Sequence, residues 1–284
     1  MGIEGLQADD RGFYIKNMPE DINRDGRDLL VALGYQLRRC PSVLSLGVRM
    51  NFADYSPEER ALIRNASKVY FPTIFFADAL DAMGKKTFPS VQCYRHLGDK
   101  IKQTLLFRLL DVPMLETRLF YGRQRKTKIL DHFDLPCVGK MPVGSSKGEG
   151  VFLIKTEDDL EAYLSKTRIA YIQQYIPMER DVRVVILGKR IVHAYWKESA
   201  PGEFRTNVAK GGKILLDPVP EDILDLALDI AVRCNFDFVG LDMCEHQGKV
   251  FILEANMNFG TKGFKEAGIN YRELLCNMVT SGEI

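Results

Sequence analysis

The stretch Phe238-Val-Gly-Leu-Asp-Met-Cys-Glu-His-Gln-Gly-Lys-Val-Phe-Ile-Leu-Glu-Ala-Asn256 decides how the C-terminal half of this chain folds. It reads as two apolar strands joined by a short turn at Gln247-Gly248-Lys249. If the turn is centred on its glycine, Asp242 and Glu254 lie opposite each other on neighbouring strands. Because side chains alternate along a strand, Asn256 shares the face of Glu254. The sequence therefore predicts two carboxylates and an amide on one face of a hairpin.

Two directly opposed carboxylates repel each other, so this pair needs a compensating cation. Carboxylate and amide oxygens are ligands of Mg²⁺, which usually takes one or two carboxylates together with substrate phosphates. The hairpin thus predicts a metal–nucleotide site made of Asp242, Glu254 and Asn256. Taken alone, the same pattern fits a half-buried hairpin whose polar residues face water equally well, and the rest of the chain has to decide.

The composition is that of an ordinary globular protein. The 284 residues are 46% hydrophobic and 27% charged, with a net charge of +1, which gives no electrostatic basis for binding nucleic acid or an anionic membrane. The six cysteines lack CxxC spacing, which argues against a structural zinc site and predicts reduced thiols, with a disulfide left open. Since no segment reads as a signal peptide or a membrane span, we expect a cytoplasmic protein.

The first ninety or so residues alternate strand-like and helix-like segments, which predicts a small α/β domain with a parallel sheet. Ser56-Pro-Glu-Glu59 has the N-cap, first-turn proline and reciprocal glutamate of a helix start, and a second helix ends near Gly84. The strand candidates are Phe13–Ile15, Leu44–Val48 and Lys68–Pro72. No glycine-rich GxGxxG sequence follows the first strand, so a dinucleotide-binding fold is not supported.

The middle and C-terminal parts combine strands, helices and one glycine-rich loop. We expect a helix over residues 99–110, and then the loop Gly144-Ser-Ser-Lys-Gly-Glu-Gly150 between two strands. Glycines allow a backbone to approach a phosphate closely, but such loops are also plain turns, and this one is not a Walker A motif. The remainder is antiparallel in character, with strands over 171–176, 181–187 and 190–196 and helices over 220–234 and 271–280.

Five segments follow one another in an order that resembles the ATP-grasp superfamily, specifically its RimK-like branch of amino-acid and peptide ligases. They are Lys100 before Asp111-Val-Pro113, Lys140 before the glycine-rich loop, Gln173-Gln-Tyr-Ile176 before Asp181-Val-Arg183, the block Arg205-Thr-Asn207 with Gly211-Gly212, and the triad Asp242, Glu254 and Asn256. The resemblance extends from about Ala66 to the C-terminus. The last two segments are its most specific parts.

The resemblance implies a role for each matching residue. Arg205 and Asn207 would hold the γ-phosphate and the developing acyl phosphate, with Arg183 in support, and Asp181 would bind the ribose. Asp242, Glu254 and Asn256 would bind one or two Mg²⁺ ions, with Mn²⁺ as a substitute. The remaining ATP contacts would come from Lys100, Lys140, Gly144, Ser145, Ser146, Gly148, Thr206 and the adenine hinge Gln174, Tyr175 and Ile176.

The implied fold is an ATP-grasp fold of the α/β class, α+β in its C-terminal part. Its divisions would be a parallel α/β domain over 1–95, a central and lid subdomain over 96–172, and an antiparallel C-terminal subdomain over 173–284. The implied enzyme is an ADP-forming ligase that joins a carboxylate to an amine, with no nucleic-acid or membrane partner and with a homodimer left open. The alternatives are a small-molecule kinase of the same fold and a non-catalytic nucleotide-binding module.

The chain departs from the family pattern in three places. Gln174 stands where such ligases often carry glutamate, a tolerable change if adenine is bound through the backbone. After Asn256 the chain continues with Met257-Asn-Phe-Gly-Thr-Lys-Gly-Phe-Lys265 in place of small residues and proline, so the family's usual substrates do not carry over. Lys262 and Lys265 in that segment could meet an acidic substrate or simply lie in solvent. Lys147, in the glycine-rich loop, could add a phosphate contact or simply lie in solvent.

Overall fold

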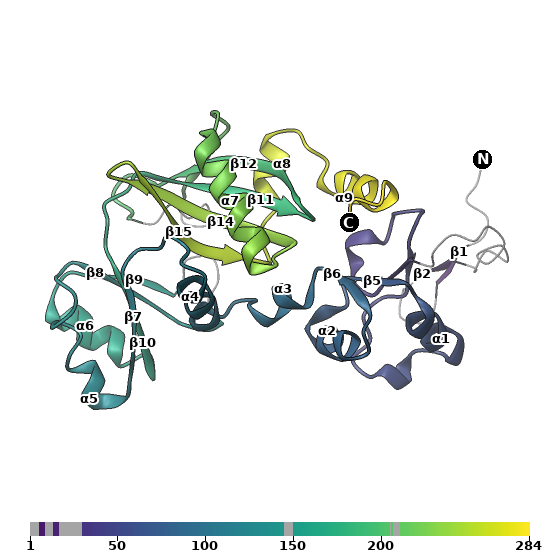
Figure 1. The fold of residues 1–284 in the computed structure, drawn as a ribbon, viewed down its shortest axis with the longest axis horizontal. Coiled ribbons are helices and arrows are strands. Elements are labelled where there is room, and N and C mark those ends of the chain that lie inside the picture. Colours follow the sequence, from purple (N-terminus) through teal and green to yellow (C-terminus); the bar gives the residue numbers. More distant parts are fainter. Residues whose placement is uncertain (1–5, 9–13, 17–29, 145–149, 205, 207–210) are drawn as a thin grey trace.

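Three larger sheets organise the chain in the computed structural model, which describes residues 6–8, 14–16, 30–144, 150–204, 206 and 211–284 (Figure 1). The N-terminal sheet has the order β4-β3-β5-β6, the middle sheet β7-β10-β8-β9, and the C-terminal sheet β13-β12-β11-β14-β15. The first is parallel and the other two are antiparallel. The predicted mixed fold, with a small parallel sheet followed by antiparallel sheets, is confirmed.

The N-terminal sheet follows a short hairpin and is covered by two helices. The Ser56 hydroxyl accepts from the backbone N–H of Glu59, and the Glu59 carboxylate accepts from the backbone N–H of Ser56, so the predicted capping box starts α1. The elements are β1 (Leu6–Ala8), β2 (Tyr14–Lys16), β3 (Leu30–Ala32), η1 (Tyr35–Leu37), β4 (Leu44–Ser45), η2 (Phe52–Asp54), α1 (Pro57–Asn65), β5 (Lys68–Tyr70), α2 (Thr73–Ala82) and β6 (Lys86–Phe88). The sequence patterns missed β3 and β6, because three-residue parallel strands are too short for a periodic signal.

The middle sheet forms the lobe at the lower left of Figure 1, with α5 and α6 beside it. Thr156 caps α6 by accepting from the backbone N–H of Asp159, and the basic helix α5 is short and mostly exposed. This lobe has its own core, which includes Phe120, Ile154 and Tyr163. The elements are α3 (Val91–Arg95), α4 (Lys100–Leu109), β7 (Thr117–Tyr121), α5 (Gly122–Lys126), β8 (Cys137–Lys140), β9 (Val151–Ile154), α6 (Glu157–Leu164) and β10 (Ile169–Gln174).

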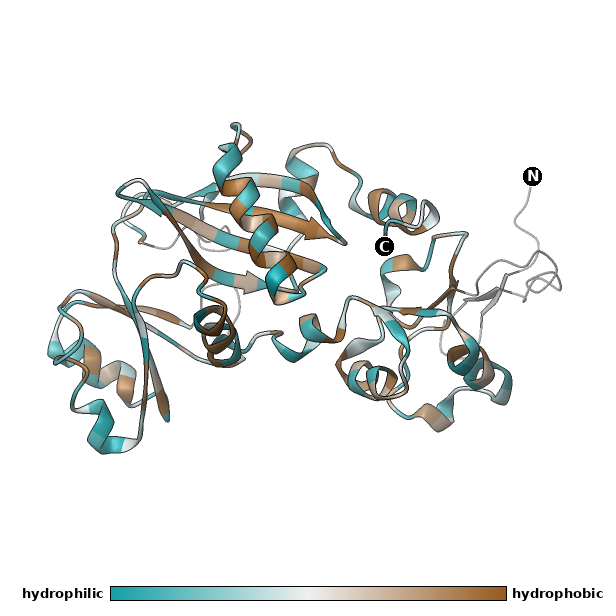
Figure 2. Ribbon diagram, viewed as in Figure 1, coloured by the Kyte–Doolittle hydropathy of each residue, from teal (hydrophilic) through white to brown (hydrophobic). Residues whose placement is uncertain are grey.

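The C-terminal sheet is long-stranded, and α7 lies across one of its faces (Figure 1). Figure 2 shows hydrophobic and hydrophilic bands alternating along α7, as expected for a helix with one face on a sheet. The elements are β11 (Arg180–Leu187), β12 (Arg190–Glu198), β13 (Lys213–Leu215), α7 (Glu221–Cys234), β14 (Phe238–His246), β15 (Lys249–Asn256), α8 (Lys262–Glu266) and α9 (Tyr271–Thr280). The face opposite α7 is therefore left for other contacts.

The N-terminal and C-terminal sheets share one hydrophobic core. Phe71 and Phe88 pack edge-on against Phe238, with ring centroids 5.5 and 5.8 Å apart. A disulfide joins Cys40, which follows η1, to Cys276 of α9, with 5.3 Å between the Cα atoms. The expectation of reduced thiols is therefore wrong for this pair, and Cys93, Cys137, Cys234 and Cys244 are the free cysteines among the described residues.

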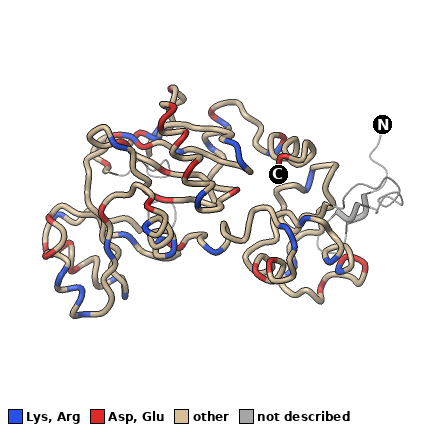
Figure 3. Tube along the Cα trace, in the orientation of Figure 1, with Lys and Arg blue, Asp and Glu red and all other residues tan. Residues whose placement is uncertain are grey.

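Charges are spread over the whole molecule. Figure 3 shows basic and acidic positions intermixed along all three parts of the trace, in keeping with the net charge of +1. Within the described residues, no helix has the length and apolar character required to cross a membrane.

Candidate active site

The β14–β15 hairpin brings Asp242 opposite Glu254, as predicted, but by a different route. The turn contains two residues, Gln247 and Gly248, both with positive φ (52° and 71°), the conformation that matches the twist of the flanking strands. This turn alone would place Asp242 opposite Leu253. A β-bulge removes Leu253 from the register, so that Met243 pairs with Ile252 and Asp242 pairs with Glu254. The bulge thus decides which residues share the face.

Asp242 is held by three side chains. Arg183, directly opposite on β11, donates from Nε to Oδ1 (2.7 Å) and from Nη2 to Oδ2 (2.6 Å). Lys197 Nζ lies 3.0 Å from Oδ1, and Asn256 donates from Nδ2 to Oδ2 at 2.9 Å. A carboxylate offers about four acceptor positions, so the described contacts already use all of them.

These contacts determine the charge of the Asp242 carboxylate. Burial alone would raise the pKa of Asp242, but Arg183 and Lys197 outweigh it and hold the pKa at about 2. Burial likewise opposes the charged form of Arg183, and the Asp242 carboxylate raises its pKa in turn. Both groups are therefore ionised at neutral pH. Cations of the protein thus compensate the acidic hairpin.

Asp181, the predicted ribose contact, belongs to the same network. Lys197 Nζ lies 3.1 Å from its Oδ1, and Thr206 donates from its hydroxyl to Oδ2 at 2.7 Å. Burial raises the pKa of Asp181, and the Lys197 charge opposes that effect. Lys197 therefore bridges the predicted ribose carboxylate and a predicted metal ligand.

Two lysines approach Glu254 from the side of the middle sheet. The backbone N–H of Lys100, at the start of α4, donates to the Pro142 carbonyl beyond β8, and its Nζ lies 2.9 Å from Glu254 Oε1. Lys140, the last residue of β8, is buried; burial lowers its pKa to about 8, while the Glu254 charge acts in the opposite direction. The two predicted phosphate-binding lysines thus lie within electrostatic range of one carboxylate.

A buried glutamine fixes the strand that carries Glu254 and Asn256. Gln103 of α4 donates from Nε2 to the Ala255 carbonyl (2.8 Å), and its Oε1 accepts from the Ala255 N–H (3.1 Å). Both backbone groups of the residue between the two predicted ligands are therefore held by one side chain. This contact aligns α4 with β15.

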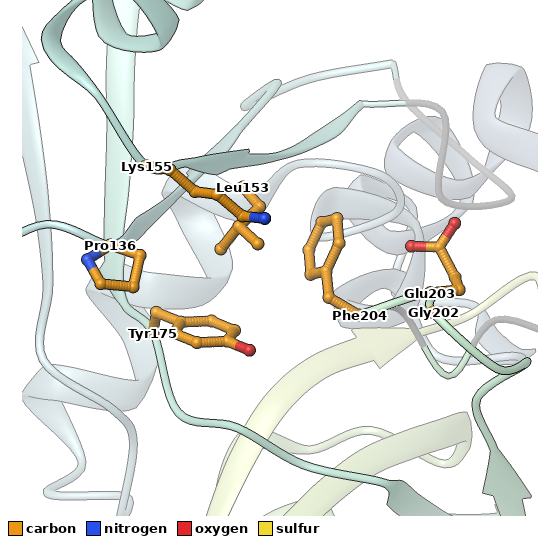
Figure 4. Close-up of a pocket in the computed structure, with 7 residues that line it drawn as sticks. All are labelled: Pro136, Leu153, Lys155, Tyr175, Gly202, Glu203 and Phe204. Atoms are coloured by element: carbon orange, nitrogen blue, oxygen red, sulfur yellow. The ribbon is translucent and has the colours of Figure 1, made fainter.

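The predicted hinge borders an open cleft of about 500 Å³, shown in Figure 4. Tyr175 and Phe204 line it from two different segments, and Lys155 extends its amine between them (Figure 4). Gln174 ends β10, whereas Ile176 is buried in a small cluster with Leu115 and Cys244. The other lining residues are Pro136, Leu153, Gly202 and Glu203.

The remaining predicted residues divide into two groups. Gly144, with φ of 75°, is a described residue at the start of the glycine-rich loop. Ser145, Ser146 and Gly148 of that loop, and Arg205 and Asn207, lie outside the described residues. Their assignments stay predictions.

Sequence reasoning missed Lys197, Gln103 and Phe204. Lys197 stands on β12 directly opposite Asp181, and alternation along two adjacent strands is the signal that could have found it. Gln103 and Phe204 had no signal, because their contacts cross 152 residues of chain or depend on a loop.

The oxygen donors suit a hard divalent cation in kind. Asp242, Glu254 and Asn256 offer two carboxylates and an amide, a donor set that Mg²⁺ completes with phosphate oxygens and water. Among the described residues, no group of three or more acidic, histidine or cysteine side chains is placed so that it could hold a metal ion. Glu254 keeps 27% of its side chain exposed, whereas Asp242 must release a present partner before it can bind a cation. The residues therefore fit the ion once Asp242 rearranges.

Comparison with known proteins identifies the family. The model of the RimK-like ATP-grasp domain matches residues 98–279. The coenzyme γ-F420-2:α-L-glutamate ligase of Methanocaldococcus jannaschii is 27% identical over 205 residues, which is 69% of this chain and 70% of that protein. The glutamate–LysW ligase ArgX of Sulfurisphaera tokodaii is 25% identical over 231 residues, 77% of this chain and 80% of that protein. The β-citrylglutamate synthase B of Danio rerio is 28% identical over 180 residues, which is 60% of this chain but only 44% of that protein.

Solved structures show the same fold. A RimK-domain ATP-grasp protein from Sphaerobacter thermophilus superposes with a TM-score of 0.65 at 16% identity, over 88% of this chain and 98% of that chain. The D-alanine–D-alanine ligase of Bacillus anthracis, solved with ATP, superposes with a TM-score of 0.60 at 16% identity, over 85% of this chain and 84% of that chain. The predicted fold, family and class of enzyme, an ATP-dependent carboxylate–amine ligase, are confirmed. The family model matches well over half of the chain, so this protein belongs to the RimK-like ATP-grasp family.

Proposed function

We propose that this protein activates a substrate carboxylate as an acyl phosphate with ATP and then joins it to an amine. The observation that carries the proposal is one row of side chains on the C-terminal sheet, where Asp242 and Glu254 are bordered by Arg183, Lys197 and Lys100. A carboxylate and a γ-phosphate are both anionic, so their approach requires such a concentration of positive charge.

The nucleotide would lie between the middle and C-terminal sheets. Its base would occupy the cleft beside Tyr175, with the ribose at Asp181. Lys100 and Lys140 would contact the phosphates, because both present ammonium groups beside Glu254. The rest of the nucleotide site would come from Gln174, Ile176 and Thr206 and from the loop residues Gly144, Ser145, Ser146 and Gly148.

The chemistry proceeds in two balanced steps. An oxygen of the substrate carboxylate forms a bond to the γ-phosphorus, and the bond to the β,γ-bridging oxygen breaks to release ADP. The amine nitrogen then attacks the acyl carbon, loses a proton, and expels inorganic phosphate as the amide forms. Arg183 would help to hold the phosphoryl group with Arg205 and Asn207. The charged residues around Asp242 and Glu254 need to orient the reactants and exclude water. No protein nucleophile is required.

A divalent cation would be held by Asp242, Glu254 and Asn256. When bound, it supplies electrostatic stabilisation to the β- and γ-phosphate oxygens. Because Asp242 has no acceptor position left, Lys197 or Asn256 would have to release it. A Lys197 that leaves Asp242 would still have Asp181 as a partner.

Hydroxylamine trapping tests the proposal. The purified protein is incubated with Mg-ATP, hydroxylamine and a panel of carboxylic acids, and ADP and hydroxamate are measured together. We expect acid-dependent hydroxamate in proportion to ADP, since an acyl phosphate reacts with hydroxylamine as it does with an amine. ADP release with a phosphate ester and no hydroxamate would replace the ligase with a kinase. ATP binding without turnover on any acid or alcohol would favour a binding module.

A matched pair of lysines on α4 controls this assay. Lys100→Met removes the cation beside Glu254, whereas Lys102→Met changes an exposed lysine three residues into the same helix. We expect at least about a tenfold loss of ATP affinity in the first variant and little change in the second. Equal affinity in both variants would remove Lys100 from the phosphate site.

A further inference from the structure

A second cavity, of about 510 Å³, lies where the N-terminal part of the chain meets the segment that follows β15. One wall comes from η1, which follows β3, and the other from α8, α9 and the turn between them. The Cys40–Cys276 disulfide joins the same two walls. The residues that carry the argument are Tyr35, Gln36, Phe264, Lys265, Tyr271 and Arg272.

This cavity, here called the α8 pocket, adjoins the row of charged residues. Tyr195 stands directly opposite Arg183 on the sheet, and Arg183 stands directly opposite Asp242, so the Tyr195 ring lies on the face that carries Asp242. Helix α8 packs onto that ring so closely that a Cβ added to Gly263 would come within 2.3 Å of it. His193 Nε2 also lies 3.1 Å from the Gly263 carbonyl oxygen. One short helix therefore contacts the active face and also lines the α8 pocket.

Two cations at the α8 pocket have no acidic partner within the part of the chain that the structure describes. Lys265 and Arg272 make no ion pair with any residue in the described parts of the chain, and none of the residues lining the pocket is acidic. The neighbouring Glu273 is engaged with Asn270, whose side chain it bonds at 3.1 Å. An anionic group in the pocket would meet positive charge from both Lys265 and Arg272.

The floor of the α8 pocket is aromatic. Phe264 and Tyr271 pack edge-on with ring centroids 5.0 Å apart, and Phe264 also lies 5.0 Å from the His193 ring. On the opposite wall, Tyr35 leaves 71% of its surface exposed. Phe264 is buried behind Tyr271 and supports it, so the exposed Tyr35 and the partly exposed Tyr271 are the rings that offer flat apolar area to a ligand at low entropic cost.

We propose that the α8 pocket binds the non-reacting end of a substrate that carries a carboxylate next to an aromatic or similarly flat apolar group. Lys265 and Arg272 hold the carboxylate, while Tyr35 and Tyr271 hold the flat group. A volume of about 510 Å³ lies within the range of sites that enclose ligands larger than a single amino acid. The reacting end then extends along α8 toward Asp242. This assignment rests on the proposed ligase function and adds the class of its substrate.

Direct binding of small acids to the full-length protein tests the proposal. Phenylacetate is the probe, phenylacetamide is its neutral counterpart, and acetate carries the charge without the ring. Saturation-transfer NMR and calorimetric titration should give saturable binding of phenylacetate, with acetate at least about tenfold weaker and phenylacetamide weaker still. Equal binding of phenylacetamide would overturn the ionic part, and equal binding of acetate would overturn the aromatic part.

Matched variants assign the binding to the pocket. Lys265→Gln and Arg272→Gln should each weaken phenylacetate about tenfold, and Tyr35→Ala should weaken it while acetate is unaffected. Lys262→Gln is the control, because Lys262 is an exposed lysine of the same short helix that does not line the pocket. Unchanged affinity in the Lys265→Gln, Arg272→Gln double variant would overturn the assignment.

A parallel titration with a fluorescent ATP analogue separates this proposal from the ligase function. If the analogue binds and phenylacetate does not, the α8 pocket proposal is overturned while the nucleotide site stands. If phenylacetate binds with the expected pattern and the analogue does not, the pocket assignment is supported and the ligase function fails. The two results come from different ligands on one protein sample.

Discussion

The C-terminal sheet meets its two neighbours in opposite ways. Toward the N-terminal sheet the boundary is apolar: Phe71, Phe88 and Phe238 pack in one shared core, and a disulfide joins Cys40 to Cys276. Toward the middle sheet, the contacts include the Lys100–Glu254 ion pair, the Gln103 bonds and one small apolar cluster, although Phe107 of α4 itself packs in the shared core. The middle lobe keeps a separate core.

The apolar boundary is suited to holding two sheets rigidly together, and the polar boundary is suited to binding a charged ligand. A shared apolar core costs too much to open repeatedly, whereas a boundary of ion pairs beside a lobe with its own core can exchange partners with a charged ligand. The nucleotide is proposed to bind at the second kind of boundary. The predictions below test the contrast, from the largest expected effect to the smallest.

Removal of Phe238 should damage the apolar boundary most. Phe238→Ala leaves a cavity against Phe71 and Phe88, and we expect the free energy of unfolding to fall by about 3–5 kcal/mol. Hydrogen exchange followed by mass spectrometry should show faster exchange in both the N-terminal and C-terminal sheets. Phe120→Ala, in the core of the middle lobe, is the matched control and should speed exchange in that lobe alone. Confinement of the Phe238→Ala effect to β14 would contradict the shared core.

Glu254→Gln should stop turnover while the fold survives. It removes a carboxylate of the proposed metal site, and we expect the rate of hydroxamate formation to fall by about 100- to 1,000-fold. Glu245→Gln changes an exposed glutamate on the same hairpin and should leave the rate nearly unchanged. Circular dichroism and thermal unfolding confirm folding in both. Near-normal activity of the first variant would refute the metal assignment.

Loss of the disulfide should weaken the apolar boundary less than loss of Phe238. The bond closes a loop of 236 residues, and Cys40→Ser should lower the free energy of unfolding by about 2–4 kcal/mol. Thiol labelling of the unreduced, denatured wild type should count four reactive cysteines of the six. A count of six would show that the two thiols stay reduced in solution.

Nucleotide affinity should depend on pH through Lys140. Its pKa is lowered to about 8, so the ammonium is present at pH 7 and is lost as the pH rises through that value. Phosphate binding favours the charged form, so above pH 8 each complex must take up a proton, and affinity should fall by up to about tenfold per pH unit. Titration of a fluorescent ATP analogue between pH 6.5 and pH 9.5 measures this dependence. A Lys140→Met variant should bind more weakly and lose the dependence; the same slope in that variant would assign it to another group.

The sequence by itself determined the elements that depend on local patterns. The capping box of Ser56 and the end points of α9 follow from neighbouring residues, because helix starts and ends are local events. The spacing of Asp242, Glu254 and Asn256 likewise predicted a shared face, because strand alternation is a local rule.

Only the tertiary structure decided which groups neutralise that face and how its register is reached. The pairing of Asp242 with Glu254 needs a bulge at Leu253, which no residue type announces. Lys197, Arg183 and Lys100 reach the carboxylates from three other elements, and the α8 pocket joins segments more than 200 residues apart. Long-range contacts are set by how whole sheets and helices pack, and a linear pattern of residues contains no direct record of that packing.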